Sequence, residues 1–371
     1  MKRDLMIFGE DWGAHPSSTQ HLARHLARDH RVLWINSLGL RRPRLTGADA
    51  SRFVRKGLAL LRNRRSAGAS GSPSIDVISP AALPWPGSSV VQTLNGMLLA
   101  QQMRPHVAAL ADRPLFWTSL PTAYAAVDKI KHGPVVYYCG DDFAALAGVD
   151  HTPVSRLEQA LVNRADLILA ASETLADRFP ARKTALLPHG VDPGSFQTPM
   201  PRPGDLPDGP VAGFYGSLAE WIDVEALAAA AAALPAWTFV CIGPVTADVS
   251  PLARLPNVRL LGPRPHAALA GYLQHWQVSM LPFRDCAQIR ACNPLKLREY
   301  LAAGTPIVST PFPALAAYRH LVIEVDFGVS LASAILAAAA DTGRNPLRRA
   351  SIASESWESR AKALSERLEA L

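Results

Sequence analysis

The sequence of 371 residues lacks the marks of several protein classes. No apolar run reaches the roughly 18 residues that a membrane-spanning helix requires, and the longest, residues 226–234, is short and alanine-rich. The four cysteines are scattered, without the close pairs typical of structural zinc. No segment repeats with a period of about 20 to 50 residues, which excludes solenoids and propellers. We therefore expect a globular, cytoplasmic protein with no metal and no cofactor.

Charge is distributed unevenly along the chain. The formal net charge is +7, and the segment 41–65 alone carries nine basic residues against one acidic residue. In residues 52–65 apolar and basic side chains interleave, which is typical of a short amphipathic helix on an anionic membrane surface. The alternative is a solvated charged insertion. Nucleic acid is not an expected partner, because the chain has no aromatic-rich basic face.

Short apolar runs alternate with longer helical patterns along the whole chain. Nearly continuous apolar strands separated by helices predict parallel sheets covered on both faces, that is, an α/β fold with doubly wound Rossmann-like sheets. The expected strands are 5–9, 32–36, 75–79, 115–119, 135–139, 167–171 and 185–188 in the first half, and 211–215, 239–243, 258–261, 278–282, 306–309 and 322–325 in the second.

The length and one proline-rich segment predict two domains. Residues 197–210 contain five prolines and two glycines and hardly any apolar residue, which suits a linker. We expect an N-terminal domain over 1–197 and a C-terminal domain over 210–353. The amphipathic helix 354–371 is a candidate to pack back on the first domain.

The stretch 278–310 is the most informative for function. A buried strand is followed by a polar loop, then a helix that starts near Pro294 and ends at Gly304. In parallel sheets ligands bind at the carboxyl ends of strands, where helix N-termini favour anions. Lys296 in the first turn can reach phosphate oxygens, and a carboxylate such as Glu299 suits a ribose diol. The alternative is an exposed amphipathic helix with a Lys/Glu pair.

Several motifs resemble one family. The segments Asn293–Lys296, Glu299–Gly304 and Pro306–Ser309 resemble the donor-site signature of the two-Rossmann-domain (GT-B) retaining glycosyltransferases of family 4, and more closely the teichuronic acid and xanthan-type polysaccharide transferases. The resemblance extends over most of the chain, and its further segments are Val211–Ser217, Trp221–Asp223, Phe239–Pro244, Leu255–Val258 with Gly262, Leu281–Arg284, Ala170–Ser172 and Leu187–Asp192.

This resemblance implies a two-domain fold with the domains facing across a cleft, and a nucleotide-sugar site in the C-terminal domain. The donor-binding residues that it implies are Tyr215, Gly216, Ser217, Arg284, Asn293, Lys296, Leu297 and Glu299. We expect Arg284 and Lys296, with Arg290 behind them, to neutralise the diphosphate without a metal, helped by the backbone N–H groups of Gly216 and Ser217. One residue departs from the pattern: Ala291 stands where many members have a glutamate that faces the donor sugar.

In the first half, Asp141 and Asp142 follow a predicted strand directly. A carboxylate at the carboxyl end of a strand can act as the general base that an inverting transferase needs. The alternative is that one of the two caps the following helix. Both are candidate catalytic residues. A metal site here is not expected, since further oxygen ligands are not evident.

The loop after the first strand is the candidate acceptor site. It contains Asp11, Trp12, Gly13 and His15, and Gly13 allows the backbone to approach a ligand closely. His189, where the family usually has Asn, is added from the resemblance.

Together these features predict a metal-independent glycosyltransferase. It would move a sugar from a nucleoside diphosphate sugar, UDP favoured, to a glycan or lipid-linked acceptor in bacterial-type surface polysaccharide synthesis, in the cytoplasm or peripherally on the inner face of the membrane. The alternatives are a nucleotide-sugar epimerase of the same fold and a non-catalytic nucleotide-sugar-binding protein.

Overall fold

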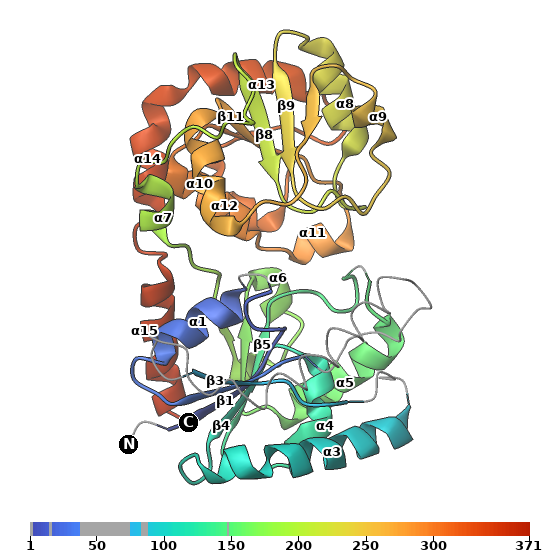
Figure 1. The fold of residues 1–371 in the computed structure, drawn as a ribbon, viewed down its shortest axis with the longest axis vertical. Helices are drawn as coiled ribbons and strands as arrows, with labels where there is room; N and C mark the ends of the chain where they lie inside the picture. Colours follow the sequence, from blue (N-terminus) through green and yellow to red (C-terminus); the bar gives the residue numbers. More distant parts are fainter. Residues whose placement is uncertain (1–2, 15–16, 38–74, 83–87, 147) are drawn as a thin grey trace. The chain divides into compact units, whose positions relative to one another are not determined.

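The computed structural model describes residues 3–14, 17–37, 75–82, 88–146 and 148–371. The chain divides into two compact units, each with its own parallel sheet (Figure 1). Unit 1 comprises Met1–Pro188 and Arg360–Leu371, and unit 2 comprises His189–Ser359.

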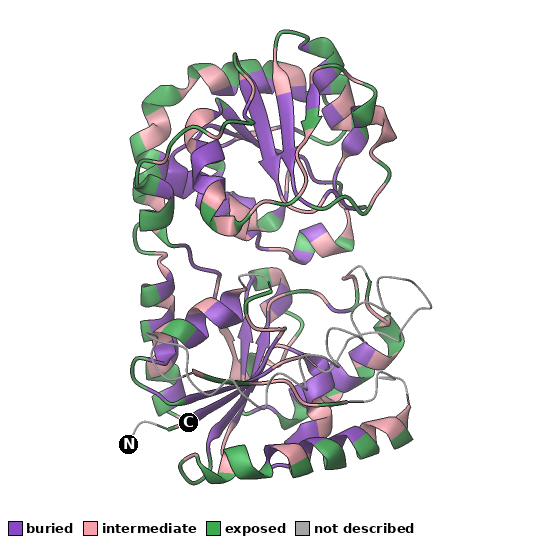
Figure 2. Cartoon of the chain, viewed as in Figure 1, coloured by how far each residue is buried: buried purple, intermediate pink, exposed green. Residues whose placement is uncertain are grey.

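Unit 1 is built on a seven-stranded sheet in the order β3-β2-β1-β4-β5-β6-β7, with every pair parallel. The strands are β1 (Leu5–Phe8), β2 (Val32–Ile35), β3 (Ile75–Ile78), β4 (Leu115–Thr118), β5 (Val135–Cys139), β6 (Leu167–Ala170) and β7 (Thr184–Leu186). The central strands are buried throughout, as Figure 2 shows in purple, which agrees with their continuous apolar sequences. All seven carboxyl ends therefore meet at one edge.

The helices of unit 1 follow the strands in alternation. They are α1 (Ser18–Leu26), α3 (Ser89–Ala108), η1 (Pro121–Ala123), α4 (Tyr124–Val127), α5 (His151–Arg164), α6 (Glu173–Ala176) and η2 (Ala181–Lys183). Ser17 begins α1 by accepting a hydrogen bond from the Gln20 amide at 3.2 Å, a typical N-cap.

Unit 2 has a six-stranded parallel sheet in the order β10-β9-β8-β11-β12-β13. Its strands are β8 (Val211–Tyr215), β9 (Thr238–Ile242), β10 (Val258–Leu260), β11 (Val278–Leu281), β12 (Ile307–Ser309) and β13 (Ile323–Glu324). In the middle of β8, Gly213 lies so close to the Trp276 ring that a Cβ there would come within 2.0 Å of it. The prediction of an α/β fold with two parallel sheets is confirmed.

The helices of unit 2 cover both faces of its sheet (Figure 1). They are α7 (Pro193–Gln197), α8 (Val224–Ala233), α9 (Ser250–Ala253), α10 (His266–His275), α11 (Ala287–Ala291), α12 (Leu295–Ala303), η3 (Pro313–Leu321), α13 (Leu331–Ala340), η4 (Thr342–Arg344), α14 (Asn345–Ser351) and the start of α15 (Trp357–Glu369). From Arg360 onward α15 belongs to unit 1.

The division between the units differs from the expected linker at 197–210. It falls at Pro188–His189, so the proline-rich segment lies inside unit 2. The segment is held by side chains of α10: Gln274 accepts from the Met200 amide at 2.8 Å, and His275 hydrogen-bonds to the Met200 carbonyl at 2.9 Å. Prolines do not prevent this packing, because side-chain donors and acceptors replace the missing backbone pairing.

Candidate functional site

The helix α12 begins and ends where its sequence predicts. Pro294 is its N-cap, and Gly304 ends it with a φ of 81° in the left-handed region that glycine favours. Buried apolar residues such as Leu297, with an exposed fraction of 0%, anchor the helix on the sheet. This packing fixes the direction of Lys296 and Glu299, which lie three positions apart.

Lys296 is a half-buried cation at the carboxyl edge of β8. Its Nζ lies 4.9 Å from the centre of the Phe214 ring and 5.7 Å from that of Phe283. Within the described residues it makes no hydrogen bond and no ion pair that meets ordinary distance limits. Burial lowers the pKa of Lys296, while Cys292 and Glu299 act in the opposite direction. A desolvated ammonium beside aromatic rings is a strong site for an anion.

Two glycines make room for this ammonium. Gly216 has a φ of 133°, and a Cβ on it would lie 2.5 Å from the Lys296 Nζ. Gly243 has a φ of 145°, and its Cβ would meet the Gly216 carbonyl oxygen at 2.1 Å. The expected anion contact from the Gly216 N–H is not available in this structure, because that N–H donates to the Ile242 carbonyl at 2.8 Å. Ser217 follows, half-buried.

Glu299 is buried and both of its oxygens accept hydrogen bonds. The Tyr215 hydroxyl donates to Oε2, and His266 Nε2 lies 2.7 Å from Oε1. The hydrogen bond to Glu299 raises the pKa of His266, although partial burial opposes this. His266 comes from α10, and sequence reasoning did not single it out, because it lies 33 residues before Glu299.

Asn293 and its neighbours form a buried polar network beneath α12. Arg298, with an exposed fraction of 4%, donates to the Asn293 amide oxygen at 2.6 Å and to Glu355 at 2.8 Å. The Tyr318 hydroxyl donates to the other oxygen of Glu355. The amide oxygen of Asn293, a candidate donor ligand, is therefore held inside unit 2, and this network orients the loop that leads into α12.

The two arginines between β11 and α12, Arg284 and Arg290, differ in their partners. Arg284 is exposed, and its backbone N–H donates to the Trp221 carbonyl at 2.9 Å. Arg290 forms a bidentate ion pair with Asp285 at 2.7 and 2.8 Å, so its charge is already compensated. Ala291 is buried at the end of α11, a short helix where the sequence predicts a loop.

In unit 1 the adjacent carboxylates at the end of β5 have different surroundings. Asp142 accepts from the Ala144 amide at 2.9 Å and from Arg178, so it stabilises the following turn. The Asp141 side chain is exposed and has no such partner among the described residues. Although solvent reaches Asp141, the protein around it partly desolvates the carboxyl group and raises its pKa, and the charges of Asp142 and Glu10 raise it further.

A second network, which sequence reasoning missed, contacts Arg178, the partner of Asp142. Glu158 of α5 is buried, accepts from the Tyr137 hydroxyl at 2.6 Å and lies 3.7 Å from Arg178. Burial raises the pKa of Glu158 and, well above its ordinary value, that of Tyr137. Arg178 thus bridges two carboxylates and fixes the backbone at the end of β5.

The candidate acceptor loop after β1 is held by its own hydrogen bonds. The Trp12 amide donates to Asn36 at 2.9 Å, and Gly13, with a φ of 77°, donates to Gln20 at 3.0 Å. Asp11 accepts from Ser37 at 3.2 Å. His15 lies outside the described residues. His189 is buried and belongs to unit 2, whereas this loop belongs to unit 1.

Metal-binding clusters and membrane-spanning helices are both absent from the part of the chain that the structure describes. No cluster of three or more His, Cys, Asp or Glu side chains there could hold a metal ion. None of its helices combines the length and the apolar character needed to cross a membrane.

Comparison with known proteins agrees with this geometry. Residues 209–341 match the family described as glycosyl transferases group 1. TuaH of Bacillus subtilis (strain 168), which is assigned to teichuronic acid biosynthesis as a glycosyltransferase, is 26% identical over 288 residues, covering 70% of this chain and 72% of TuaH.

Solved structures show the same fold over the whole chain. Alr3699/HepE of Anabaena, crystallised with UDP and glucose, superimposes with a TM-score of 0.70 at 16% identity, over 99% of each chain. Sucrose-phosphate synthase of Thermosynechococcus elongatus does so with a TM-score of 0.72 at 17% identity, also over 99% of each chain. Residues 209–341 therefore match the glycosyl transferases group 1 family, and the chain has the two-sheet GT-B fold of these structures.

Proposed function

We propose that the enzyme transfers a sugar from a nucleoside diphosphate sugar, UDP favoured, to a glycan or lipid-linked acceptor in the synthesis of a bacterial-type surface polysaccharide. The observation that carries the proposal is the half-buried Lys296 ammonium at the carboxyl edge of β8, without an ion pair in the described part of the chain. The UDP and glucose bound by HepE and the teichuronic acid assignment of TuaH support the donor and acceptor classes.

In this proposal Lys296 binds the diphosphate of the donor. Charge builds up on the leaving diphosphate in the transition state, and a preorganised cation in a partly desolvated site stabilises it. Arg284, an exposed residue between β11 and α11, adds a second cation. These two charges are proposed to make a divalent metal unnecessary, so activity should persist in a chelator.

Glu299 is proposed to bind the ribose. Each of its oxygens accepts one hydrogen bond from within unit 2, which leaves a lone pair on each for a ribose hydroxyl. Tyr215 and His266 then act as positioning residues that hold the carboxylate in one rotamer. This arrangement favours a diol-bearing nucleoside over a 2′-deoxynucleoside.

Asp141 is proposed as the residue that receives the proton of the acceptor hydroxyl. It has the raised pKa of a general base, whereas Asp142 is occupied by Arg178. A base of this kind predicts inversion at the anomeric carbon. Net retention would instead assign the proton to the leaving diphosphate and leave Asp141 as a ligand for an acceptor hydroxyl.

A nucleotide panel tests the donor half directly. UDP, GDP, ADP and dTDP are added to the full-length protein, and the shift in melting temperature is measured with and without EDTA. One nucleotide should stabilise the fold clearly more than the others, because only a ligand that binds the native state raises its stability. Equal, negligible shifts with all four would refute the donor site.

Turnover of the preferred donor separates the proposal from its alternatives. Transfer to a glycan or lipid-linked acceptor, with its anomeric outcome read by NMR, supports the proposed reaction. Conversion of the donor sugar to its epimer without an acceptor would favour the epimerase. Binding with neither transfer nor hydrolysis would favour a nucleotide-sugar-binding protein.

A further inference from the structure

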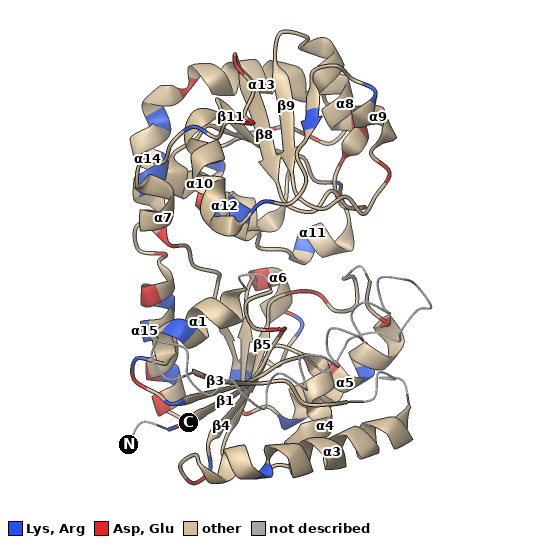
Figure 3. Ribbon diagram, viewed as in Figure 1, with Lys and Arg blue, Asp and Glu red and all other residues tan. Residues whose placement is uncertain are grey.

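The helix α3 of unit 1 has an unusual surface for a helix that faces solvent. Its sequence, SVVQTLNGMLLAQQMRPHVA, contains no acidic residue, and its first charged residue is Arg104. Figure 3 shows the helix almost entirely in tan. A solvent-exposed helix normally carries charged residues on its outer face, so the composition of α3 indicates a different environment for that face.

The inner face of α3 packs firmly on unit 1. Leu99 and Met103 are fully buried. Gly96 approaches the Ala125 carbonyl so closely that a Cβ would lie 2.4 Å from the oxygen. These contacts tie the helix along its length to α4, consistent with the finding that no described helix qualifies as a membrane span.

The outer face carries what we call the α3 apolar stripe. It consists of Val90, Leu94, Met97 and Leu98, with exposed fractions of 66%, 44%, 55% and 38%. Their spacing of four, three and one residues places them on one side of the helix. Single exposed apolar residues are common on protein surfaces, but four along one helix face form a patch of the kind that binds a membrane or a partner.

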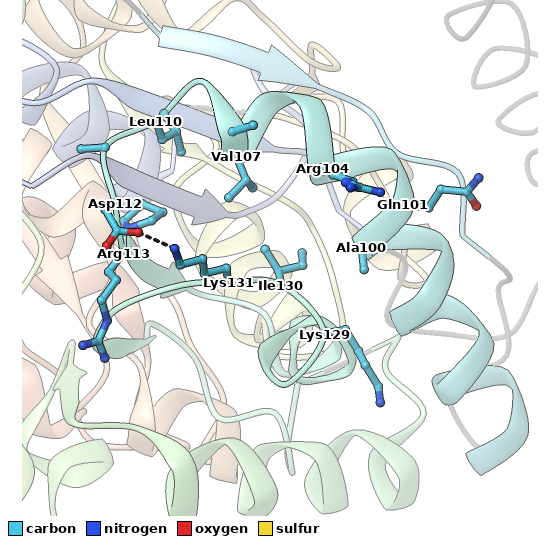
Figure 4. Close-up of a pocket in the computed structure, with 13 residues that line it drawn as sticks. Ala100, Gln101, Arg104, Val107, Leu110, Asp112, Arg113, Lys129, Ile130 and Lys131 are labelled. Atoms are coloured by element: carbon cyan, nitrogen blue, oxygen red, sulfur yellow. Dashed lines mark hydrogen bonds and ion pairs between the residues drawn. The ribbon is translucent and has the colours of Figure 1, made fainter.

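At the C-terminal end of α3 the surface becomes basic. A groove of about 660 Å³, which we call the basic groove, is lined by Arg104, Arg113, Lys129 and Lys131 together with Asp112 and apolar residues. Figure 4 shows Lys131 paired with Asp112, at 2.5 Å, and the other three basic side chains around the groove. Four cations against one anion leave a net positive charge.

Arg113 adds a sign of functional constraint. Its φ of 57° is the one positive value at a non-glycine residue among the described residues. A long side chain in this conformation is strained, and asparagine or glycine would be more stable there. The turn nevertheless carries an arginine, and this residue is one of those that line the basic groove.

We propose that the α3 apolar stripe and the basic groove together dock unit 1 on a bilayer that contains anionic phospholipid. The stripe enters the boundary between headgroups and acyl chains, and the groove binds lipid phosphate, as amphipathic interfacial helices do. A second copy of this chain fits less well, because α3 contains no acidic residue that could complement the positively charged groove beside the stripe. Docking on a bilayer brings unit 1 to the proposed lipid-linked acceptor. Only in this respect does the inference rest on the proposed function.

Vesicle flotation of the full-length protein tests the stripe. We compare phosphatidylcholine vesicles with vesicles that contain about one third phosphatidylglycerol. The protein should float with the anionic vesicles, and Leu94→Gln with Met97→Gln should weaken that binding about tenfold through loss of buried apolar area. The control pair, Leu336→Gln with Leu347→Gln, has similar exposure (49% and 58%) in unit 2 and should bind as the parent does.

A second pair of variants tests the groove. Arg104→Gln with Lys129→Gln should weaken binding about tenfold or more and flatten its dependence on salt. Arg156→Gln with Arg182→Gln, two exposed arginines of the same unit outside the groove, should change it little. A variant in which the basic residues of 52–65 are neutralised is measured in parallel. The inference requires that Leu94→Gln with Met97→Gln weakens vesicle binding while residues 52–65 are unchanged.

Three outcomes would overturn the inference. The first is no flotation of the parent protein, and the second is equal flotation of the parent and both test pairs. The third is a concentration-dependent dimer, seen by light scattering, that Leu94→Gln with Met97→Gln converts to monomer while vesicle binding is absent. Melting temperature and the nucleotide-induced shift are measured on every variant, so a failed donor site and a failed membrane surface are told apart.

Discussion

Within the described residues, the carboxyl edge of each sheet places an unpaired ionisable side chain beside a paired one. In unit 1, Asp142 is bound by Arg178, and Asp141 beside it has no partner among the described residues. In unit 2, Glu299 is bound by Tyr215 and His266, and Lys296 has no ion pair in that part of the chain. The two edges share an arrangement but differ in the sign of the charge.

Desolvation shifts both groups toward their neutral forms. It raises the pKa of Asp141 and lowers the pKa of Lys296. A carboxylate with a raised pKa takes up a proton more readily, and a desolvated ammonium interacts more strongly with an anion. The same physical effect therefore suits one edge to accepting a proton and the other to binding a phosphate.

The largest expected effect is on the carboxylate side of this comparison. Asp141→Asn should lower kcat for transfer by about 10²- to 10⁴-fold, the usual contribution of a general base, and leave nucleotide affinity unchanged. In the parent enzyme the acid limb of the profile of kcat/KM against pH should lie above the range of an ordinary aspartate, because the pKa of Asp141 is raised and the base must be ionised.

Asp142→Asn provides the matched control. It should weaken the contact with Arg178 and lower the melting temperature, with a smaller effect on kcat than Asp141→Asn has. If the two variants lose the same activity, or if Asp141→Asn changes only KM for the acceptor, the assignment of the base to Asp141 is wrong.

The next largest effect is expected on the cationic side. Lys296→Ala should lower kcat/KM for the donor by about 10²- to 10³-fold, as the loss of one preorganised group facing a developing negative charge does. Titration calorimetry with the preferred nucleoside diphosphate should show a matching loss of affinity. Lys296→Arg is expected to restore little, because the space between Gly216 and the Phe214 ring fits an ammonium.

Arg290→Ala is the control for this variant. Asp285 compensates the charge of Arg290 on the surface, so its removal should change donor affinity less than about threefold. Equal losses in Arg290→Ala and Lys296→Ala would mean that the loop binds phosphate through general positive charge, and the special role of Lys296 would be withdrawn.

The strands and helix ends were predictable from the sequence for local reasons. Short continuous apolar runs such as Val135–Cys139 and Val211–Tyr215 predict strands buried on both faces, and both are strands in the structure. Gly304 ends α12 because its left-handed conformation is unfavourable for other residues. Each of these signals lies within a few neighbouring residues.

The networks around the site were not predictable, because they join residues from different elements. Arg178 meets Asp142 from 36 positions away, and His266 meets Glu299 from 33 positions away. Which of these side chains come together depends on strand order and helix packing, which one sequence does not specify. The availability of the Gly216 N–H also depends on a partner, Ile242, in the neighbouring strand.

The smallest expected effect concerns the pair of His266 with Glu299 and depends on pH. The pKa of His266 is higher in the folded protein than its ordinary value of about 6.5. The folded state therefore binds that proton more tightly than the unfolded state does. The resulting stabilisation is fully present below about pH 6.5 and is lost as the pH rises through the higher folded value.

We therefore expect His266→Gln to be less stable than the parent at pH 5.5 and nearly equal to it at pH 8.5, with a difference of about 1 kcal/mol at the lower pH because the imidazole is partly exposed. Urea unfolding at a series of pH values measures this difference. The variant keeps a side-chain amide that can still donate to Glu299 but loses the ring contact with Phe196, so the part of the difference that changes with pH reports the charge. A difference that is constant with pH would show that the hydrogen bond contributes without the charge, and that His266 is a neutral positioning residue like Tyr215.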